Sequence, residues 1–562
     1  MFVEDLMNLY DVMEDTMNLH IYNKGFIIFA MVCSIILGII ICKSAVYANN
    51  NTSIDDFSYY NNNGEIIITG YSGEGDVIVV PDYIDGKPVI SIGNYAFRGN
   101  TALVSITIPE GVTIIGDSAF SGCKSLEKIE LPESILNIGD YAFNECKSLE
   151  EIYFSDNLSS IGTSAFRNCS SLSEISIPDG VVIIRDRVFY ECDGLKKVHF
   201  SPNTSFIGER AFDSCENLTE LNLPEGLETI GDYAFAWCTG LDNIIFPNTL
   251  VKMGKEAFYG CDSLKSIVIP GSLIEISEEA FCSCNSLSEI VISSGVESIG
   301  VGAFSNCSSL ERISIPNSVT TIGVEAFESC WDLVEVTIPS SVTKIGVDAF
   351  SYTDSKLLVF GEPGTVAESY SNKNDISFIP CVIRFSDVRN SDFYCYPVLW
   401  GYYSNPQIAS GITKDKYKPL NLCNRAQVVT FLWRYNGCPE PWHSKSPFKD
   451  VTEDKFYYKA VLWAYERNIT SGRPNGLFDP LADCSRAEFV TFLWRSKYNP
   501  SPDNSVNPFV DVPNGAFYRE AVLWANEKGI TYGTSSTKFS PSTKVNRAQV
   551  ITFLYRSYGK TY

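Results

Sequence analysis

The chain of 562 residues contains very little histidine, and its basic side chains are outnumbered by acidic ones. Its 3 histidines, His20, His199 and His443, lie far apart, and none has a metal-ligand or triad-like neighbourhood. Lys and Arg number 43 against 67 Asp and Glu, a net charge of −24 that excludes nucleic acid as a partner, because phosphates need a basic face. No glycine-rich phosphate loop or nucleophile motif stands out. We therefore expect no enzyme activity, no cofactor and no metal.

Long hydrophobic runs are also missing, with one exception near the N-terminus. Phe26–Ile41 form a run of 16 uncharged, mostly apolar residues, preceded by Lys24 and followed by Ala48 at a suitable cleavage point. This order is typical of a secretory signal peptide. We predict that residues 1–48 are such a peptide, cut after Ala48. The acidic residues within 1–16 are unusual for this region and suggest the hypothesis that translation begins at Met17 instead of Met1. An uncleaved membrane anchor is the alternative interpretation.

A repeat of 23 residues fills the middle of the chain. Each copy has an Ile-x-Leu-Pro-like segment that alternates apolar and polar residues, as a short strand does, before Pro ends it. In one copy we expect a strand at Lys128–Leu131, a turn at Gly139 and a short helical or 3-10 segment starting at Ala142. A single copy cannot bury its apolar face, so the repeat predicts a solenoid of stacked coils. The repeat is marked by the phenylalanines Phe97, Phe120, Phe143, Phe166, Phe189, Phe212, Phe235, Phe258, Phe281, Phe304, Phe327 and Phe350.

Ten of the 18 cysteines, from Cys123 to Cys330, share one position in the repeat. Stacking places them in an interior ladder, where they are expected to act as small apolar side chains with free thiols. Disulfides between neighbouring coils are the alternative, although parallel side chains suit the geometry of that bond poorly. Cys282 lies off the ladder and is expected to be exposed.

The repeat resembles the BspA-type (Treponema-type) leucine-rich repeats of bacterial surface proteins. The resemblance covers about residues 56–380 and implies an N-terminal cap at 49–95, leucine-rich repeats at 96–355 and a C-terminal cap at 356–380. Caps are needed because the end coils would otherwise expose apolar edges.

One residue of each strand is predicted to face outward, between two inward apolar positions. Within this column Ile245, Val268 and Val291 occupy adjacent coils and would form an exposed apolar patch, which favours a protein contact. The alternative is that these residues only suit strands. The candidate partner-binding face comprises Tyr153, His199, Ile245, Val268 and Val291.

After about residue 381 a longer repeat begins. Phe448-Lys449-Asp450-Val451 recurs as Phe509-Val510-Asp511-Val512, and earlier as Phe385-Ser386-Asp387-Val388. Each copy is followed by an apolar segment of the type Val-Leu-Trp-Ala, then a turn-rich loop, then a second apolar run. The pattern predicts three modules of helix, loop and helix.

Three arginines, Arg425, Arg486 and Arg547, stand 61 residues apart at the start of the second predicted helix of each module. Around Arg486, Ser485 and Glu488 form a capping box, and Asn with Gln can do the same in the other two modules. The arginines lack such an account, because the helix dipole disfavours positive charge there. Beside free backbone amides they are candidate anion sites. Pairing with a nearby carboxylate of the module is the alternative.

These modules resemble S-layer-homology (SLH) domains, whose TRAE-like motif matches Ser-Arg-Ala-Glu and the two Asn-Arg-Ala-Gln segments. The resemblance places SLH 1 at 382–440, SLH 2 at 446–498 and SLH 3 at 507–562. It implies a pseudo-trimer that binds an acidic secondary cell-wall polymer, often pyruvylated, through the motif arginine and a glycine-containing loop. SLH 1 departs by keeping Gly411 but lacking the second loop glycine, which puts its site in doubt. The implied polymer-binding residues are Arg425, Arg486, Arg547, Gly472, Gly476 and Gly533.

The sequence therefore predicts an α+β multidomain fold, with a leucine-rich-repeat solenoid of 12 repeats of 23 residues followed by an all-α SLH pseudo-trimer. The expected protein is secreted to the cell wall, where the SLH modules bind the wall polymer. The solenoid is expected to bind a protein or cell-surface partner, as an adhesin does. A structural S-layer-associated component, with the solenoid as a spacer, is the alternative.

Overall fold

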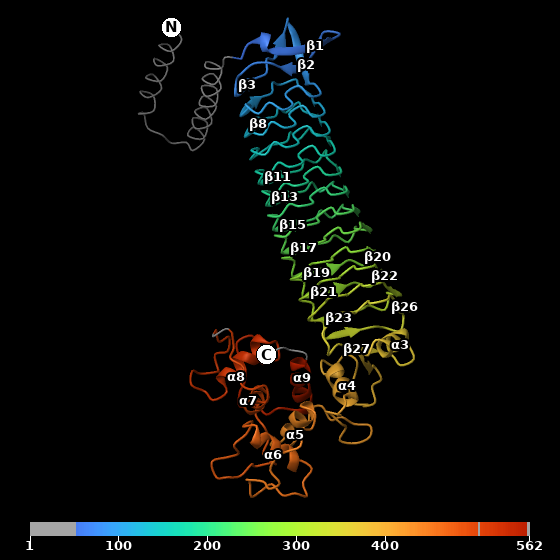
Figure 1. The fold of residues 1–562 in the computed structure, drawn as a ribbon, viewed down its shortest axis with the longest axis vertical. Helices are drawn as coiled ribbons and strands as arrows, with labels where there is room; N and C mark the ends of the chain where they lie inside the picture. Colours follow the sequence, from blue (N-terminus) through green and yellow to red (C-terminus); the bar gives the residue numbers. More distant parts are fainter. Residues whose placement is uncertain (1–51, 504–505, 559–562) are drawn as a thin grey trace, which may run out of the picture. The chain divides into compact units, whose positions relative to one another are not determined.

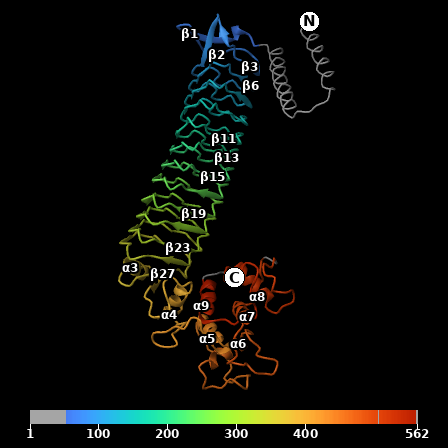
Figure 2. The same ribbon diagram turned by 180° about the vertical axis from the view of Figure 1, so that it is seen from behind.

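The computed structural model describes residues 52–503 and 506–558. The predicted signal peptide lies outside these residues. The described part of the chain divides into two compact units, of which the first ends at Leu172 and the second begins at Ser173. Figures 1 and 2 draw the coils of the repeat in blue to yellow and the helical modules in orange to red. Both units contain the same kind of coil, and the second also contains the helical modules. Within the described residues no helix is both long and apolar enough to cross a membrane.

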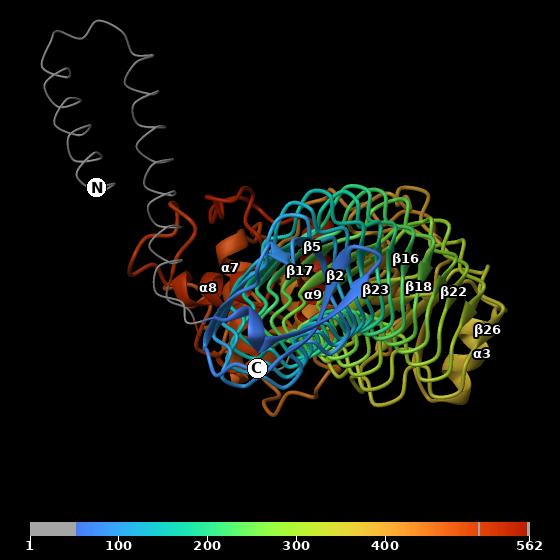
Figure 3. The same ribbon diagram turned by 90° about the horizontal axis from the view of Figure 1, so that it is seen from above.

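Most coils of 23 residues supply two short strands, and most of these strands pair in parallel with the equivalent strand of the next coil. In the first unit, Ile106 of β6 (Ser105–Thr107) pairs with Ile129 of β8 (Lys128–Glu130), one repeat later. Ile115 of β7 (Ile114–Ile115) pairs likewise with Ile138 of β9 (Asn137–Ile138). Figure 3 shows the coils from above; a coil that has both strands contributes one strand to each of two sheets. The sequence predicted the first strand of each coil but not the second.

The first unit opens with an antiparallel hairpin, β1 (Phe57–Asn62) and β2 (Glu65–Tyr71), which pairs with the first parallel strand and covers the edge of the stack. This agrees with the need for an N-terminal cap. Its other elements are η1 (Ile54–Asp56), β3 (Val77–Val79), β4 (Tyr83–Ile84), β5 (Lys87–Ile92) and β10 (Ser160–Ile161).

The second unit continues both series of strands. The first series is β11 (Glu174–Ser176), β13 (Lys197–His199), β15 (Glu220–Asn222), β17 (Asn243–Ile245), β19 (Ser266–Ile269), β21 (Glu289–Ile292), β23 (Arg312–Ser314), β25 (Glu335–Thr337), β27 (Leu358–Gly361) and β28 (Ser377–Pro380). The second is β12 (Ile183–Ile184), β14 (Phe206–Ile207), β16 (Thr229–Ile230), β18 (Lys252–Met253), β20 (Glu275–Ile276), β22 (Ser298–Ile299), β24 (Thr321–Ile322) and β26 (Lys344–Ile345). Helix α3 (Val366–Lys373) lies between β27 and β28 and contacts both strands, as a C-terminal cap would.

The Ala-Phe segment of each coil is a chain of turns, so the prediction of a helical segment was wrong. Tyr141 and Glu145 adopt left-handed φ angles of 57° and 61°, which interrupt a helix. The amide of Phe143 donates to the carbonyl of Ala165 in the next coil at 2.7 Å, instead of to its own turn. Hydrogen bonds between coils therefore alternate with local ones, such as that from the amide of Cys146 to Phe143 at 3.1 Å, and no continuous helix forms. The same stacking explains the glycine after the second strand, since a Cβ on Gly139 would lie 2.7 Å from the backbone of Gly116.

The repeated phenylalanines form stacks in the core of each unit. Ring centroids of neighbours lie from 5.1 Å apart, for Phe97 and Phe120, to 5.6 Å, for Phe281 and Phe304. Nearly all of these rings are fully buried, and each adds stability of about 1.5–3 kcal/mol from burial. The predicted interior ladder of phenylalanine is present in both units.

The repeated cysteines are buried beside the phenylalanines as free thiols, in line with the sequence prediction. The thiol of Cys146 donates to the carbonyl oxygen of Phe120, in the preceding coil, at 3.2 Å. The thiols of Cys123, Cys215 and Cys238 likewise donate to the carbonyl of the repeated phenylalanine in the preceding coil. Cys282 is also buried, with 7% of its surface exposed, so the expectation that it is exposed was wrong. Its sulfur lies 3.7 Å from the hydroxyl oxygen of Ser283.

The helical modules contain α4 (Cys395–Tyr403), α5 (Arg425–Tyr435), α6 (Tyr458–Glu466), α7 (Arg486–Ser496), α8 (Arg519–Glu527) and α9 (Arg547–Ser557). The two helices of one module are not the ones that pack most closely. Instead α5 packs with α6, α7 with α8, and α9 with α4. Each second helix thus contacts the first helix of the following module, and the third module closes the ring on the first. The sequence did not predict this packing between helices of different modules.

Candidate functional site

The candidate site lies where the modules meet, at the N-termini of α5, α7 and α9. Each of these helices begins with a complete capping box, as the sequence predicted: Asn424 with Gln427, Ser485 with Glu488, and Asn546 with Gln549. In each box the N-cap side chain accepts the amide of the third helical residue, and that residue's side chain accepts the N-cap amide.

The remaining amides of these helix starts bind carbonyl groups of the next module. The amide of Arg425 donates to Ala482 at 2.9 Å, and that of Ala426 to Pro480 at 3.1 Å. The corresponding arginine amides of α7 and α9 donate to Thr543 and Asn421. The expectation of free backbone amides beside the arginines was therefore wrong. These amides hold the modules together and are not open to an anion.

A ring of three backbone hydrogen bonds lies just before these helices. The amide of Cys423 donates to Val545, that of Val545 to Cys484, and that of Cys484 to Cys423, each at 2.9 Å. One residue from every module takes part, and all three are buried. The ring gives the modules the arrangement expected of a pseudo-trimer.

The three arginines are buried at the junctions between modules, with 3%, 2% and 5% of the surface of Arg425, Arg486 and Arg547 exposed. In each, Nε donates at 2.9 Å to a carbonyl oxygen of the next module in the ring, on Phe478, Phe539 and Tyr417 respectively. Each guanidinium also lies over the aromatic ring of the residue whose carbonyl it binds. The arginines are clamps between modules, a role that the sequence did not predict.

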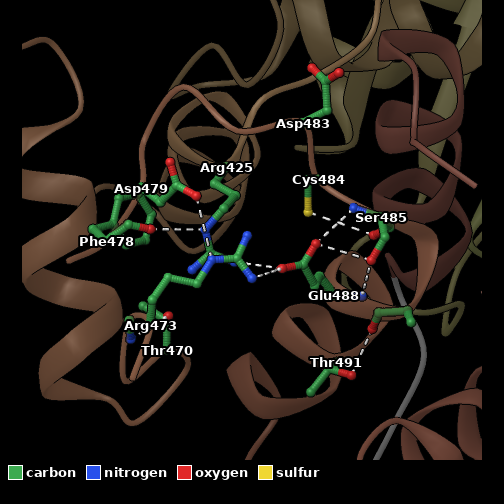
Figure 4. A network of polar contacts seen from close by, with 12 residues as sticks. Arg425, Thr470, Arg473, Phe478, Asp479, Asp483, Cys484, Ser485, Glu488 and Thr491 are labelled. Carbon is green, nitrogen blue, oxygen red and sulfur yellow. Dashed lines mark hydrogen bonds and ion pairs between the residues drawn. The ribbon is translucent and has the colours of Figure 1, made fainter. Parts of the chain in front are cut away.

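The junctions differ in how the buried positive charge is balanced. At the first, Nη1 of Arg425 binds the Glu488 carboxylate at 2.8 Å, and Arg473 binds the same carboxylate at 3.0 Å (Figure 4). Burial lowers the pKa of Arg425, as does the neighbouring Arg473, while Glu488 opposes the shift. This is the carboxylate pairing that the sequence left open as the alternative, and here it comes from the neighbouring module.

The other two junctions have glutamine where the first has Glu488. Gln549 and Gln427 occupy the equivalent helix position, and no ion pair to Arg486 or Arg547 occurs among the described residues. Arg486 binds only the Phe539 carbonyl and, at 3.4 Å, the Thr531 hydroxyl. Burial lowers its pKa to about 10. Neither of these two guanidinium groups forms an ion pair with a carboxylate among the described residues, although the more distant Asp511 carboxylate opposes the lowering of the Arg486 pKa.

The predicted loop glycines lie in the loops that carry these carbonyl groups. A Cβ on Gly472 would lie 2.3 Å from the ring of Phe448, and one on Gly533 would lie 2.6 Å from the ring of Phe509. Gly476 has open space around it and a φ of 77°, which glycine adopts easily. The structure brings these loops to the arginine of the preceding module, whereas the sequence grouped each loop with its own arginine.

The repeated aspartate of the Phe-x-Asp-Val segments fixes the same loops and was missed as a site residue. The carboxylate of Asp450 accepts the amides of Phe478 and Asp479 at 2.9 and 2.7 Å. Asp511 and Asp387 make the equivalent bonds in the other modules. The recurrence of this aspartate in all three Phe-x-Asp-Val segments could have identified it as a site residue, because an aspartate that only faced solvent would have no reason to recur.

Comparison with known proteins gives a family for each part. Residues 84–196, 159–270 and 228–358 match the BspA type leucine rich repeat region, and residues 447–490 and 508–551 match the S-layer homology domain. The chain is a BspA-type leucine-rich repeat protein with S-layer homology domains.

Similar proteins are bacterial surface proteins. The chain is 28% identical over 138 residues to a "Cell surface protein" of Thermoanaerobacter kivui, covering 24% of this chain and 18% of that protein. It is 25% identical over 149 residues to a "Cellulosome-anchoring protein" of Acetivibrio thermocellus, covering 25% and 33%. An "Endoglucanase" of a Bacillus strain is 29% identical over 112 residues, or 12% of its length. The chain spans only a third or less of these relatives, and the SLH domains place it at the cell surface.

Solved structures of leucine-rich repeat proteins are also similar. A leucine-rich repeat protein from Bacteroides ovatus is 30% identical, with a TM-score of 0.44, and the match covers 59% of this chain and all of that one. A leucine rich cell surface protein from Faecalibacterium prausnitzii is 29% identical, with a TM-score of 0.41, and the match covers 58% and 97%.

The two SLH matches lie in the second and third modules, and the structure gives the first module the same parts. SLH 1 has a capped α5, a clamp arginine and a loop fixed by Asp387. Its loop carbonyl, on Tyr417, receives Arg547 of SLH 3. Without SLH 1 the ring of modules would not close.

The candidate partner-binding face lies on the leucine-rich repeats and is exposed as predicted. Ile245, Val268 and Val291 are 63%, 57% and 46% exposed. His199 is held by Glu174 at 2.6 Å, and Tyr153, in the first unit, is 73% exposed. The structure thus places these side chains outward, and the partner they would contact stays a prediction.

Proposed function

We propose that the SLH modules hold this protein on the cell wall by binding an acidic wall polymer, while the leucine-rich repeats are displayed to bind a protein or cell-surface partner. Anchoring agrees with the names of the relatives, among them a cellulosome-anchoring protein and S-layer proteins. We infer the polymer-binding residues from the balance of charge at each junction between modules, and this balance differs from one junction to the next.

The observation that carries the proposal is the pair of buried guanidinium groups without an ion-paired carboxylate. Removing a cation from water is costly, and Arg486 and Arg547 have only neutral partners among the described residues. An acidic sugar placed over the loop of Gly533, or over the loop of Gly411, would compensate this charge. It need not touch the guanidinium, because a unit charge still acts over several ångströms in a medium of low dielectric constant. Arg425, already paired with Glu488, would attract such a ligand least.

The test introduces a carboxylate beside each uncompensated arginine and leaves the arginine in place. Gln549→Glu and Gln427→Glu copy the native arrangement of Glu488, which caps its helix and binds Arg425. The fold should therefore survive, with a melting temperature at or above that of the parent protein. We expect the double variant to bind purified cell wall about tenfold more weakly in a pelleting assay, equivalent to about 1.4 kcal/mol.

Asn499→Asp is the matched control, since it adds a negative charge at an exposed position beyond the C-terminal end of α7, whereas Arg486 begins that helix. It should leave wall binding within twofold of the parent value. Full wall binding by the folded double variant would refute the assignment of Arg486 and Arg547 to polymer binding.

A further inference from the structure

A cleft opens in the first unit between the N-terminal cap and the first coils of the repeat. Its volume is about 490 Å³, and its lining includes Asp82, Tyr83, Thr107, Glu110 and Glu130. Thr107 and Glu130 belong to the outward column of the first sheet, where β6 and β8 pair. The cleft therefore lies on the face that the sequence assigned to partner binding, at its N-terminal end.

The walls of the cleft are fixed by main-chain hydrogen bonds. Tyr83 of β4 pairs with Pro88 of β5, and the amide of Val89 donates to Asp82 at 2.9 Å. The amide of Val80 donates to Thr107 at 3.1 Å and ties the cap to the first coil. The cleft is thus preformed, which lowers the entropic cost of binding a ligand.

The charge of the cleft is uniformly negative. Three of its lining residues are acidic and none is basic. Glu130 pairs with Lys128 at 3.1 Å, whereas no ion pair to Asp82 or Glu110 occurs among the described residues. Residues 52–172 contain 17 acidic side chains against 6 basic ones, so the surroundings reinforce the local field.

An aromatic ring and three prolines complete the lining. Tyr83 is 61% exposed, and Pro88, Pro109 and Pro132 supply rigid apolar surface. A tyrosine ring beside carboxylates is suited to a guanidinium or ammonium group, which gains both ion pairs and a cation–π contact. The volume is within the range of ligand sites, well above what a bare ion needs, and no group of side chains with a metal-binding composition occurs among the described residues.

We propose that this cleft binds an arginine- or lysine-bearing segment of a partner protein. The inference rests on the proposed display role of the leucine-rich repeats and names the class of partner. A segment lying along the outward column would pass from the cleft to Glu151 and Tyr153, whose hydroxyl donates to the Glu151 carboxylate at 2.8 Å. A cationic segment would therefore meet Glu130, which is shared with Lys128, and then Glu151 after it leaves the cleft.

The test uses the full chain and a fluorescein-labelled hexaarginine peptide, with binding followed by fluorescence anisotropy at about 0.15 M salt, where charges beyond about 8 Å are screened. Asp82→Asn with Glu110→Gln should weaken peptide binding about tenfold, because it removes the two carboxylates that lack an internal partner. Glu127→Gln with Glu150→Gln is the matched control, since it removes two exposed carboxylates of the same unit outside the cleft. The control pair should change binding by less than twofold.

Three outcomes would overturn the proposal. The first is that both double variants weaken peptide binding equally. The second is that hexaarginine does not bind the parent protein at concentrations up to about 1 mM, which is the weak limit of measurable affinity. The third is that neutral cellohexaose displaces the peptide. Binding to purified cell wall is measured on the same variants and should not change, since the SLH modules are untouched. Loss of peptide binding with intact wall binding therefore separates this inference from the anchoring proposal.

Discussion

At the scale of single residues, the three motif arginines combine two tasks that conflict. Each clamps a loop of the next module, which requires burial, and each retains a positive charge that burial makes costly. The buried charge of Arg425 is balanced by an ion pair with Glu488, whereas no ion pair to Arg486 occurs among the described residues. A single difference of residue type, Glu488 against Gln549 and Gln427, therefore sets the charge balance of each junction, and under the proposed function it determines which junctions attract an acidic ligand.

This assignment predicts a specific rescue. Arg425→Gln should destabilise the helical modules by about 3 kcal/mol, because it removes a clamp and leaves Glu488 with one ion-pair partner, Arg473, among the described residues. Adding Glu488→Gln should recover about 1–2 kcal/mol of this loss, because the junction then has the neutral partner found at the other two. Urea unfolding of the full chain followed by circular dichroism measures both effects. A double variant no more stable than Arg425→Gln alone would mean that the carboxylate plays no part.

Residue-level prediction from the sequence succeeded where the partner is local and failed where it is distant. The capping boxes were predicted because Ser485 and Glu488 are three residues apart on one helix. The clamp of Arg486 was not, because its acceptor is a backbone oxygen of Phe539, 53 residues away, and backbone acceptors leave no trace in side-chain patterns. Cys282 was misassigned for a related reason, since its direction depends on a turn whose left-handed residues the sequence does not mark.

At the scale of elements, the coil depends on ladders of identical residues. The phenylalanine spacing predicted the stack because a repeated apolar residue can be buried only by its own copies. The ladder thiols share this environment, and burial raises the pKa of Cys123 and of Cys330 to about 12 from the ordinary 9.0. The second short strand in each coil was missed because its two residues are too few to show alternation.

The thiol ladder predicts loss of stability in alkali. Below about pH 9 the thiols are protonated in both states, so their contribution is complete. As pH rises further, the unfolded chain loses these protons while the folded ladder keeps them up to about pH 12, so the free energy of unfolding falls by about 1.4 kcal/mol per thiol and pH unit. The variant with Ala at Cys215, Cys238 and Cys261 should show a shallower fall between pH 9 and 10 in urea titrations under reducing conditions.

Cys438→Ala is the control for this experiment, because Cys438 lies outside the ladder and is only partly buried. Its pH dependence should match that of the parent protein. Identical slopes for the ladder variant and the parent would show that other groups cause the alkaline loss.

At the scale of the second unit, the repeats and the SLH modules share one core. Phe360 of β27 is fully buried, and its ring lies 5.2 Å from that of Tyr396 in α4 and 6.3 Å from that of Tyr555 in α9. On β23, two strands away from β27 in the same sheet, the guanidinium of Arg312 lies over the Tyr555 ring at 5.0 Å. The first and last helices of the module ring thus both pack on the end of the repeat stack. The sequence analysis predicted separate domains for these parts. The two repeats have different lengths, so no common period indicates that their apolar residues share a core.

Removal of residues 381–562 therefore has two expected consequences. The truncated chain should be released from the cell wall, because it lacks every SLH module. It should also self-associate, because Phe360 and Ile379, which are 0% and 4% exposed in the intact chain, would face water on an uncovered sheet. Phe360→Glu in the truncated chain should restore a monomer in analytical ultracentrifugation, whereas Val268→Glu, at a position that is 57% exposed already, should not. A truncated chain that is monomeric without substitution would mean that the SLH modules rest on the repeats without completing their core.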